Sequence, residues 1–367
     1  MLVLSEDQRM LMESARGAIA AKAPIAMWRK LRAEASPDGF SRGFWRDCAE
    51  MGWTGVLVPE KFGGLDFGFV GAGLIAREMA RTLAPSPFLS TAVLAASVLR
   101  RGESTAQAKW LPRIASGEAI IALAIDEGPR PIEDTFSLAT TSPQGWQLTS
   151  EKHFVLDGHV ADAFLVYARN FHGEPGLFFV EADTPALTRD ARTLLDNRRV
   201  ASVKLERAAA PADARLGGPE LVEATLDVGR AVVAASLCGV AEEAFARTMS
   251  YLKARKQFDR PIGSFQVLQH RAARMHLAIE NSWSATLKAL KALDEGAPTA
   301  ELDVAVAKAK ASETACEVTA ECLQMHGGIG MTDEFDIGLF LKRARVDSVL
   351  FGDAAYHADR VATMLRY

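Results

Sequence analysis

Cysteine is scarce in this 367-residue sequence, and the few cysteines present form neither a CxxC pair nor a spacing suited to metal ligation. The four are Cys48, Cys238, Cys316 and Cys322. We therefore expect reduced, buried thiols in a cytoplasmic protein, and no metal site.

The sequence also lacks an excess of one charge and any long hydrophobic run. Lys and Arg number 42 and Asp and Glu number 46, which argues against a nucleic-acid-binding protein. No apolar run reaches the ~18 residues of a membrane helix and the N-terminus lacks a signal-peptide core, so we expect no membrane association. A Gly-rich stretch at residues 56–68 lacks the G-x-G-x-x-G order, which excludes a Rossmann dinucleotide loop.

The sequence has residue patterns typical of helices at both ends and patterns typical of β-strands between them. Residues 1–118 open on a capping box, Ser5 to Gln8, and carry apolar stripes at helical spacing. Residues 119–215 hold short apolar or alternating runs separated by Gly, Pro and Asp. Long Ala-rich helical segments fill residues 216–367. We therefore predict an α+β fold with an N-terminal helical domain (1–118), a middle antiparallel β domain (119–215) and a C-terminal four-helix bundle (216–367).

The individual elements can also be assigned to residue ranges. We expect strands at residues 119–127, 146–158, 162–170, 176–182 and 200–205, followed by a linker at residues 211–219. We expect the long helices at residues 221–256, 264–295 and 301–326.

One stretch, residues 251–275, combines a basic helix end, a turn and the start of a new helix. Pro261 and Gly263 mark the turn, because Pro lacks an N–H and Gly tolerates positive φ. Free N–H groups at a helix start, with the donors of Arg255 beside them, can hold a phosphate. The alternative is a solvated basic helix end.

The wording of this stretch, RKQFDRPIGSFQVLQH, resembles the R-x-x-F-G-x-x-I-x-x-F-Q motif of acyl-CoA dehydrogenases, with Asp259 in place of the usual Gly. PEKFGG (residues 59–64) and QMHGGIG (residues 324–330) also resemble segments of that family, as does the order of helical and β domains. The resemblance implies an FAD enzyme in which these segments hold the adenosine and pyrophosphate of FAD from a neighbouring subunit. By position, the residues that would do so are Arg255, Gln257, Phe258, Gln266, Gln324 and Gly328. For Gly327 and Gly328 the alternative is a helix C-cap.

Two further segments resemble parts of the same family. In KHFVLDGHVADAFLVYAR (residues 152–169), Phe154 stands where the family has a Trp that covers the flavin; the alternative is an inward-facing strand residue. LDVGRAVVAA (residues 226–235) resembles the helix that contacts coenzyme A, which implies substrate binding by Asp227 and Arg230. An ordinary ion pair between residues three apart on a helix is the alternative there.

The catalytic base of the family is missing from its expected places. Acyl-CoA dehydrogenases abstract the α proton of the thioester with a Glu, while the β hydrogen leaves as hydride to the flavin. The matching positions here are Phe351, in Phe351-Gly352-Asp353, and Gly229. Asp353 is the nearest carboxylate, and it serves either as the base or as the N-cap of the following helix.

The C-terminal segment, residues 326–362, resembles the small subunits of pimeloyl-CoA-type dehydrogenases and the partner subunits of steroid side-chain dehydrogenases. This implies FAD-dependent α,β-dehydrogenation of an acyl-CoA, carried out by a hetero-oligomer of this chain and a homologous subunit. Electrons would pass to an electron-transfer flavoprotein. The alternative is a non-catalytic structural subunit that completes the FAD site of a catalytic homologue. The resemblance does not specify which acyl chain the substrate carries.

Overall fold

The computed structural model describes residues 3–101, 105–128, 135–143 and 145–367. It divides into two compact units. One unit contains Met1–Lys30, Phe69–Ala84 and Arg230–Tyr367, and the other contains Leu31–Gly68 and Pro85–Gly229.

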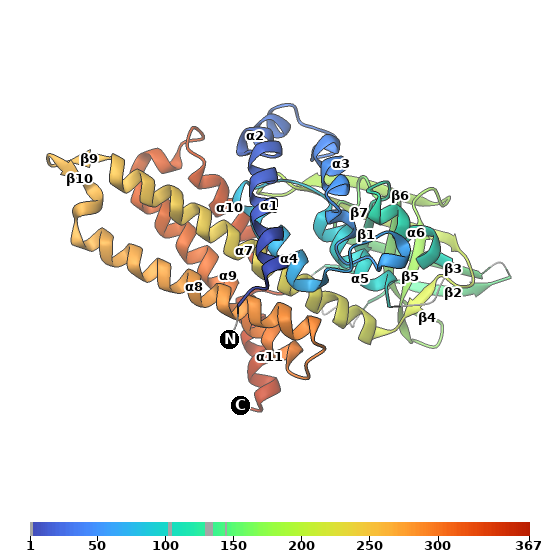
Figure 1. The fold of residues 1–367 in the computed structure, drawn as a ribbon. Coiled ribbons are helices and arrows are strands. Elements are labelled where there is room, and N and C mark those ends of the chain that lie inside the picture. Colours follow the sequence, from blue (N-terminus) through green and yellow to red (C-terminus); the bar gives the residue numbers. More distant parts are fainter. Residues whose placement is uncertain (1–2, 102–104, 129–134, 144) are drawn as a thin grey trace. The chain divides into compact units, whose positions relative to one another are not determined.

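The first unit is helical and confirms the predicted C-terminal bundle (Figure 1). Its helices are α1 (Glu6–Lys22), the first part of α2 (Ile25–Ala33), α4 (Gly68–Arg81), most of α7 (Pro219–Ala254), α8 (Gln266–Asp294), α9 (Ala300–His326), α10 (Ile337–Val349) and α11 (Ala354–Leu365). The three long helices begin and end within two residues of the predicted bounds. The Ser5 capping box is also confirmed, since the Ser5 hydroxyl accepts from the backbone of Gln8 and the Gln8 side chain accepts from the backbone of Ser5.

Small residues and ion pairs bring α4 and α7 together. A Cβ at Gly239 would overlap the carbonyl oxygen of Arg77, so the two helices cross at a distance that only Gly allows. The guanidinium of Arg77 pairs with Glu242 at 2.5 Å and lies 4.0 Å from the ring of Trp283 on α8. Close backbone packing and an ion pair therefore stabilise the same crossing of α4 and α7.

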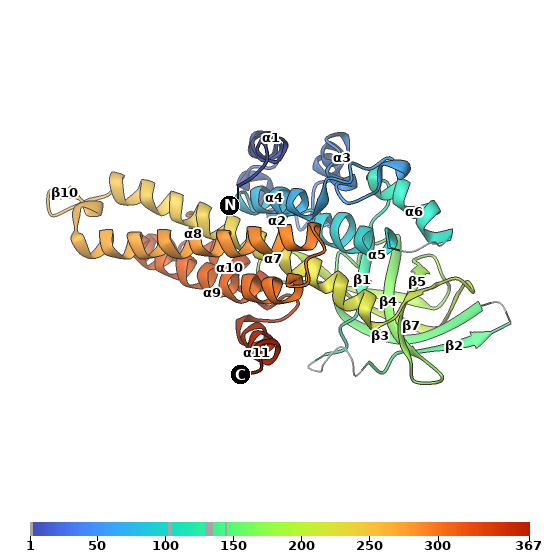
Figure 2. The same ribbon diagram turned by 60° about the horizontal axis from the view of Figure 1, so that its bottom comes forward.

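The second unit is built on an eight-stranded sheet (Figure 2). Its strands are β1 (Ile121–Ala124), β2 (Leu138–Ser142), β3 (Gly145–Leu156), β4 (Ala163–Asn170), β5 (Pro175–Glu181), β6 (Leu187–Thr193), β7 (Arg199–Ala210) and β8 (Arg215–Gly217). The spatial order is β6-β7-β3-β2-β4-β5-β8, with β1 against β4. The unit also contains α3 (Arg42–Glu50), α5 (Ala96–Leu99), α6 (Thr105–Ala115), the π-helical segment η3 (Phe88–Ala95) and the short helices η1 (Trp53–Gly55) and η2 (Glu60–Phe62).

The sheet confirms the β domain but differs from the prediction in four places. Strand β2 lies outside all of the predicted strands. The sheet is mixed rather than wholly antiparallel, because β4 pairs in parallel with both β1 and β2. Strand β6 was not expected, since its polar residues are almost all exposed at the edge of the sheet and show no alternation. Residues 211–219 were expected to be a linker, but β8 lies within them and pairs with β5.

The turn after α7 is a β-hairpin with its positive φ angles in an unexpected place. Strand β9 (Lys256–Gln257) pairs with β10 (Arg260–Pro261), and the two tip residues Phe258 and Asp259 have φ of 54° and 62°. These are the angles that a tight two-residue hairpin demands. The predicted turn is present, but Gly263 does not adopt positive φ; a Cβ there would lie 3.0 Å from the carbonyl oxygen of Leu252.

Burial explains the apolar character of α7 and the state of the cysteines. Helix α7 is long and apolar enough to cross a membrane, which the sequence did not lead us to expect, but 89% of its apolar window is buried inside the protein. Of the cysteines, Cys48, Cys238 and Cys322 are buried as predicted, whereas Cys316 is half-buried. Burial raises the pKa of Cys238 to about 11 and that of Cys322 to about 12, so both remain thiols.

Candidate functional site

The two segments assigned to FAD meet at one end of the helical bundle. The ring of Tyr251, near the end of α7, stacks on the ring of His326 at the end of α9, with centroids 4.4 Å apart. The Tyr251 hydroxyl also donates to the carbonyl oxygen of His326. This contact brings the hairpin after α7 and the glycine turn after α9 to the same end of the unit, and Figure 1 shows the hairpin protruding there.

The hairpin residues face solvent and could receive an external group. Arg255, Gln257 and Gln266 are exposed, and Phe258 is 86% exposed. Helix α8 starts at Gln266 with no side-chain cap on its first N–H groups. A positive helix end, free donors and a nearby guanidinium suit a phosphate-bearing ligand, so the residues present fit the pyrophosphate of FAD.

The glycine turn ends α9 and leaves part of its backbone open. Gly327 is the C-cap of α9 with φ of 64°, which confirms the structural alternative. Gln324 and Gly328 are exposed, and a Cβ at Gly328 would meet nothing within 4 Å. Open space at Gly328 leaves the backbone accessible to a ligand.

The segment that matches the catalytic Glu of the family is held by three basic side chains. Phe351 and Gly352 have φ of 58° and 105°. Arg230 Nε donates to the Phe351 carbonyl oxygen at 3.2 Å, and Nε2 of His357 lies 3.1 Å from the same oxygen. Lys308 Nζ donates to the Gly352 carbonyl oxygen at 2.8 Å. The structure thus brings the predicted substrate residue Arg230 to the Phe351 loop.

Burial and neighbouring charges shift the pKa values of His357 and Lys308. Burial, with Arg230 and Lys308 nearby, lowers the pKa of His357 to about 3, so this imidazole is neutral and donates from Nε2. Burial lowers the pKa of Lys308 to about 8, although Asp347 opposes the shift. Lys308 also donates to the Ser348 carbonyl oxygen at 2.9 Å and to the Ser312 hydroxyl at 3.1 Å. This side chain is therefore committed to fixing the loop.

Asp353 is the N-cap of α11. Its carboxylate accepts a hydrogen bond from the backbone N–H of Tyr356 at 2.8 Å, and its backbone is extended. This geometry confirms the capping alternative of the sequence analysis. The Asp353 side chain is exposed to solvent.

Phe154 occupies an unusual position on β3. It lies where the register between β3 and β7 shifts, between Lys152 and Val155, and has φ of 51°. The bulge turns its ring outward, and Phe154 is 62% exposed. The interpretation of Phe154 as an inward-facing strand residue is therefore wrong, because alternation along a strand fails at a bulge.

Two acidic residues of the second unit are largely enclosed: Glu127 is half-buried and Asp227 is buried. Glu127 receives hydrogen bonds from the Thr135 and Ser137 side chains and pairs with Lys152 Nζ at 2.6 Å. These bonds hold the pKa of Glu127 at about 2 although burial opposes them. Asp227, on the part of α7 in this unit, is 8% exposed. Glu127 therefore stabilises the loop before β2 as a fixed ion pair.

Sequence reasoning missed Lys308 and His357. A signal for Lys308 existed, since it falls on the apolar stripe of α9 with Val304, Ala311 and Ala315, all of them buried. A lysine on a buried stripe requires acceptors, and the loop carbonyl groups supply them. No comparable pattern marks His357.

Comparisons with known proteins agree with this architecture. The N-terminal domain model of acyl-CoA dehydrogenases matches residues 5–118, and the C-terminal domain model matches residues 217–365. Acyl-CoA dehydrogenase IpdE2 of Mycobacterium tuberculosis is 31% identical, over 92% of this chain and 91% of that protein.

Two solved structures are similar along nearly the whole chain. One is a variant of the Tcur3481-Tcur3483 steroid ACAD, with a TM-score of 0.89 and 30% identity over 98% of each chain. The other is the ChsE4-ChsE5 complex from Mycobacterium tuberculosis, with a TM-score of 0.91 and 27% identity over 100% of this chain and 99% of that one. With matches of sequence and structure across both helical domains and the sheet, the chain belongs to the acyl-CoA dehydrogenase family, whose members are FAD-dependent oxidoreductases.

Proposed function

We propose that this chain is one subunit of a hetero-oligomeric acyl-CoA dehydrogenase and that a homologous partner chain supplies the catalytic base. The observation that carries the proposal is the Phe351 loop. A phenyl ring cannot accept the α proton, and the carboxylate of Asp353 two residues away is occupied as the cap of α11. The similarity to the Tcur3481-Tcur3483 steroid ACAD and to the ChsE4-ChsE5 complex, each named for two proteins, supports a hetero-oligomer.

In this proposal the exposed end of the bundle binds FAD of the complex. Arg255 and the uncapped start of α8 would hold the pyrophosphate, while Gln324 and the open backbone at Gly328 would contact the adenosine. When bound, FAD accepts the hydride that leaves the β carbon of the acyl chain. Asp227 and Arg230 are retained as the proposed contacts to coenzyme A, and an electron-transfer flavoprotein as the proposed electron acceptor.

A specific observation favours a second candidate, a purely structural subunit. Arg230 already donates to the Phe351 carbonyl oxygen and is 1% exposed, so its guanidinium is committed to the loop. Such a chain would complete the FAD site of its partner without binding acyl-CoA itself. Calorimetry with a panel of acyl-CoA thioesters, including dicarboxylic and steroid side chains, separates the two candidates.

Co-purification tests the proposal. We expect the chain to form a stable complex when co-expressed with a homologous acyl-CoA dehydrogenase encoded beside it, and the complex to show flavin absorbance. The chain purified alone should retain little flavin. A lone chain that is monomeric and holds stoichiometric FAD would contradict the proposal.

Replacing Arg255 tests the assignment of the bundle end. We expect Arg255→Ala to lower flavin retention on dilution of the complex, since a charge-assisted hydrogen bond contributes roughly 1.5–3 kcal/mol. Lys253→Ala removes the same charge from an exposed side chain of the same helix end and is the matched control. Equal flavin loss from the two variants would contradict a specific contact of Arg255 with FAD and would indicate that the overall positive charge of the helix end retains the flavin.

A further inference from the structure

A small pocket in the second unit lies away from the Phe351 loop and the bundle end. It is formed by the segment before α3, the segment from Pro85 to Leu89, the end of β3 and the residues that lead into β7. Its volume is about 30 Å³. A site that holds one water needs about 10–15 Å³, so the pocket has room for about two water-sized groups.

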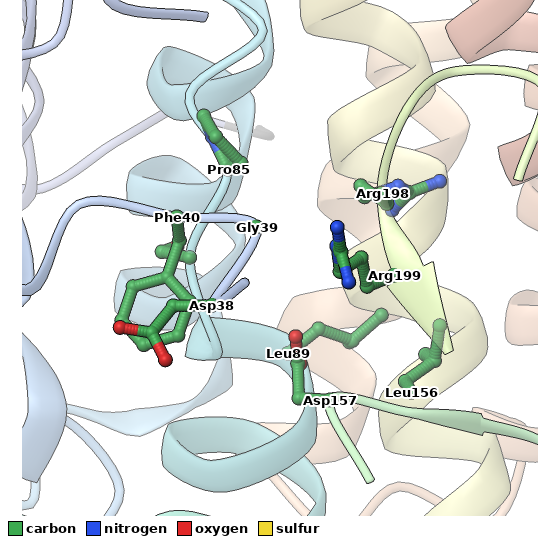
Figure 3. A pocket seen from close by; sticks show the side chains of 10 residues that line it. Asp38, Gly39, Phe40, Pro85, Leu89, Leu156, Asp157, Arg198 and Arg199 are labelled. Carbon is green, nitrogen blue, oxygen red and sulfur yellow. The ribbon is translucent and has the colours of Figure 1, made fainter. Parts of the chain in front are cut away.

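One part of the pocket lining is apolar. Phe40 and Pro85 are buried, while Leu89 and Leu156 are partly exposed. Figure 3 shows Phe40 and Pro85 on one side and Leu156 on the other. Such walls suit the carbon chain of a ligand.

The lining also contains four charged residues, and among the described residues one of its two arginines has no carboxylate partner. Arg198 Nε donates to Asp196 at 2.6 Å. Within the part of the chain that the structure describes, the hydrogen bond of Arg199 goes to the carbonyl oxygen of Ala35 at 3.3 Å, and this guanidinium forms no ion pair. A carbonyl oxygen leaves the positive charge of Arg199 uncompensated. Figure 3 shows this guanidinium at the pocket.

Neither carboxylate of the lining forms an ion pair with Arg199 in the described residues. Asp38 pairs with Arg42 at 2.7 Å. Asp157 accepts a hydrogen bond from the Ser90 hydroxyl at 2.6 Å. The pocket therefore presents a guanidinium beside apolar walls.

We propose that this pocket binds the carboxylate group of a small organic acid, with Arg199 as its charged partner and the apolar walls around its carbon chain. Two water-sized positions match the two oxygens of a carboxylate, which a guanidinium binds through paired donors. Inorganic phosphate has no carbon chain that could contact the apolar walls. This inference concerns a pocket of the second unit alone and stands whether or not the chain acts as a dehydrogenase subunit.

Ligand-observed NMR on the full chain at pH 5.5 tests the proposal, with butanoate, butanamide and inorganic phosphate as probes. Burial raises the pKa of Asp157 to about 6, so at pH 5.5 this carboxyl of the lining is mostly neutral and does not repel an anion. We expect saturable binding of butanoate, and at least tenfold weaker binding of butanamide and of phosphate. Because butanamide has the same carbon chain without the charge, this comparison needs no variant. Equal binding of butanoate and butanamide, or equal binding of butanoate and phosphate, would overturn the proposal.

Substitution of Arg199 locates the site. We expect Arg199→Gln to weaken butanoate binding by at least tenfold. Arg192→Gln is the matched control, since Arg192 is an exposed arginine of the neighbouring strand β6 and does not line the pocket. Thermal melts establish that both variants are folded. Butanoate binding that is unchanged in a folded Arg199→Gln protein, or that falls equally in both variants, would place the ligand elsewhere.

Discussion

At the scale of single residues, Asp353 is a carboxylate for which the sequence allowed two roles, catalytic base or helix N-cap. Its hydrogen bond to the Tyr356 N–H satisfies a donor at the start of α11, and Asp is a favoured cap. We expect Asp353→Ala to lower the free energy of unfolding by about 1 kcal/mol, whereas Asp353→Asn keeps the cap. Urea unfolding measures both. Asp359→Ala, an exposed carboxylate within the same helix, is the control and should change little.

Asp157 is expected to make stability depend on pH. Burial raises its pKa from 3.8 to about 6, against the hydrogen bond from Ser90 and the nearby Arg198. The protonated form is therefore favoured in the folded protein. This contribution is fully present below about pH 4 and is lost as the pH rises through 6.

The Asn variant tests this assignment. Besides Arg198 and Arg199, the pocket is lined by Asp38, which pairs with Arg42, and His159 lies two residues away along the chain. Asp157→Asn removes the ionisation and suits the positive φ of this residue. We expect it to be more stable than the wild type at pH 8 by about 1–2 kcal/mol, after solvent screening at the pocket, and nearly equal at pH 4. Urea unfolding at the two pH values checks this, and a gain of the same size at both would contradict it.

Some of the residues discussed above could be identified from the sequence, and others could not. The positions of Arg255, Gln324 and Phe351 followed from motifs, because each is near a turn whose Gly or Pro is visible in the sequence. The outward direction of Phe154 could not be predicted, since a bulge in β3 depends on how β7 pairs with it. The bonds of Lys308 to the Phe351 loop likewise join segments 40 and 44 residues apart.

At the scale of elements, local signals predicted the helices well and the sheet in part. The helices α7, α8 and α9 are long and periodic, and their bounds need only local information. Strand β8 has three residues and is defined by its partner β5, and the parallel pairing of β2 with β4 joins distant segments. Such pairings follow from tertiary contacts rather than from propensity.

The crossing of α4 and α7 provides a test of the bundle. We expect Gly239→Ala to lower the free energy of unfolding by about 1–3 kcal/mol, because the new methyl group would overlap the Arg77 carbonyl oxygen and force the helices apart. Gly17→Ala on α1 is the matched control, as a Cβ there meets nothing within 4 Å. It should raise stability by up to about 1 kcal/mol through helix propensity. Thermal unfolding compares the two, and equal effects would show that the crossing tolerates more space than the structure allows.

At the scale of the whole molecule, two features bear on the proposed assembly with a homologous subunit. The bundle end exposes the ring of Phe258 and the side chain of Arg255 on a hairpin. An exposed aromatic ring beside an arginine is a combination that is enriched in protein interfaces. The Phe351 loop in turn lacks a base that a partner could supply. Both features fit one subunit of an unlike pair.

Turnover is the property that decides between these roles. General-base catalysis contributes about 10²–10⁴-fold, so we expect the lone chain to oxidise acyl-CoA thioesters slower than the complex by that order, even with FAD added. In the complex, Asp353→Asn should leave the rate unchanged, because the carboxylate of Asp353 caps α11. If Asp353 were the base, the same substitution would abolish turnover while flavin stayed bound. Anaerobic reduction of the flavin by acyl-CoA, followed by absorbance, measures each case, and rapid reduction in the pure homo-oligomer would contradict the need for a partner.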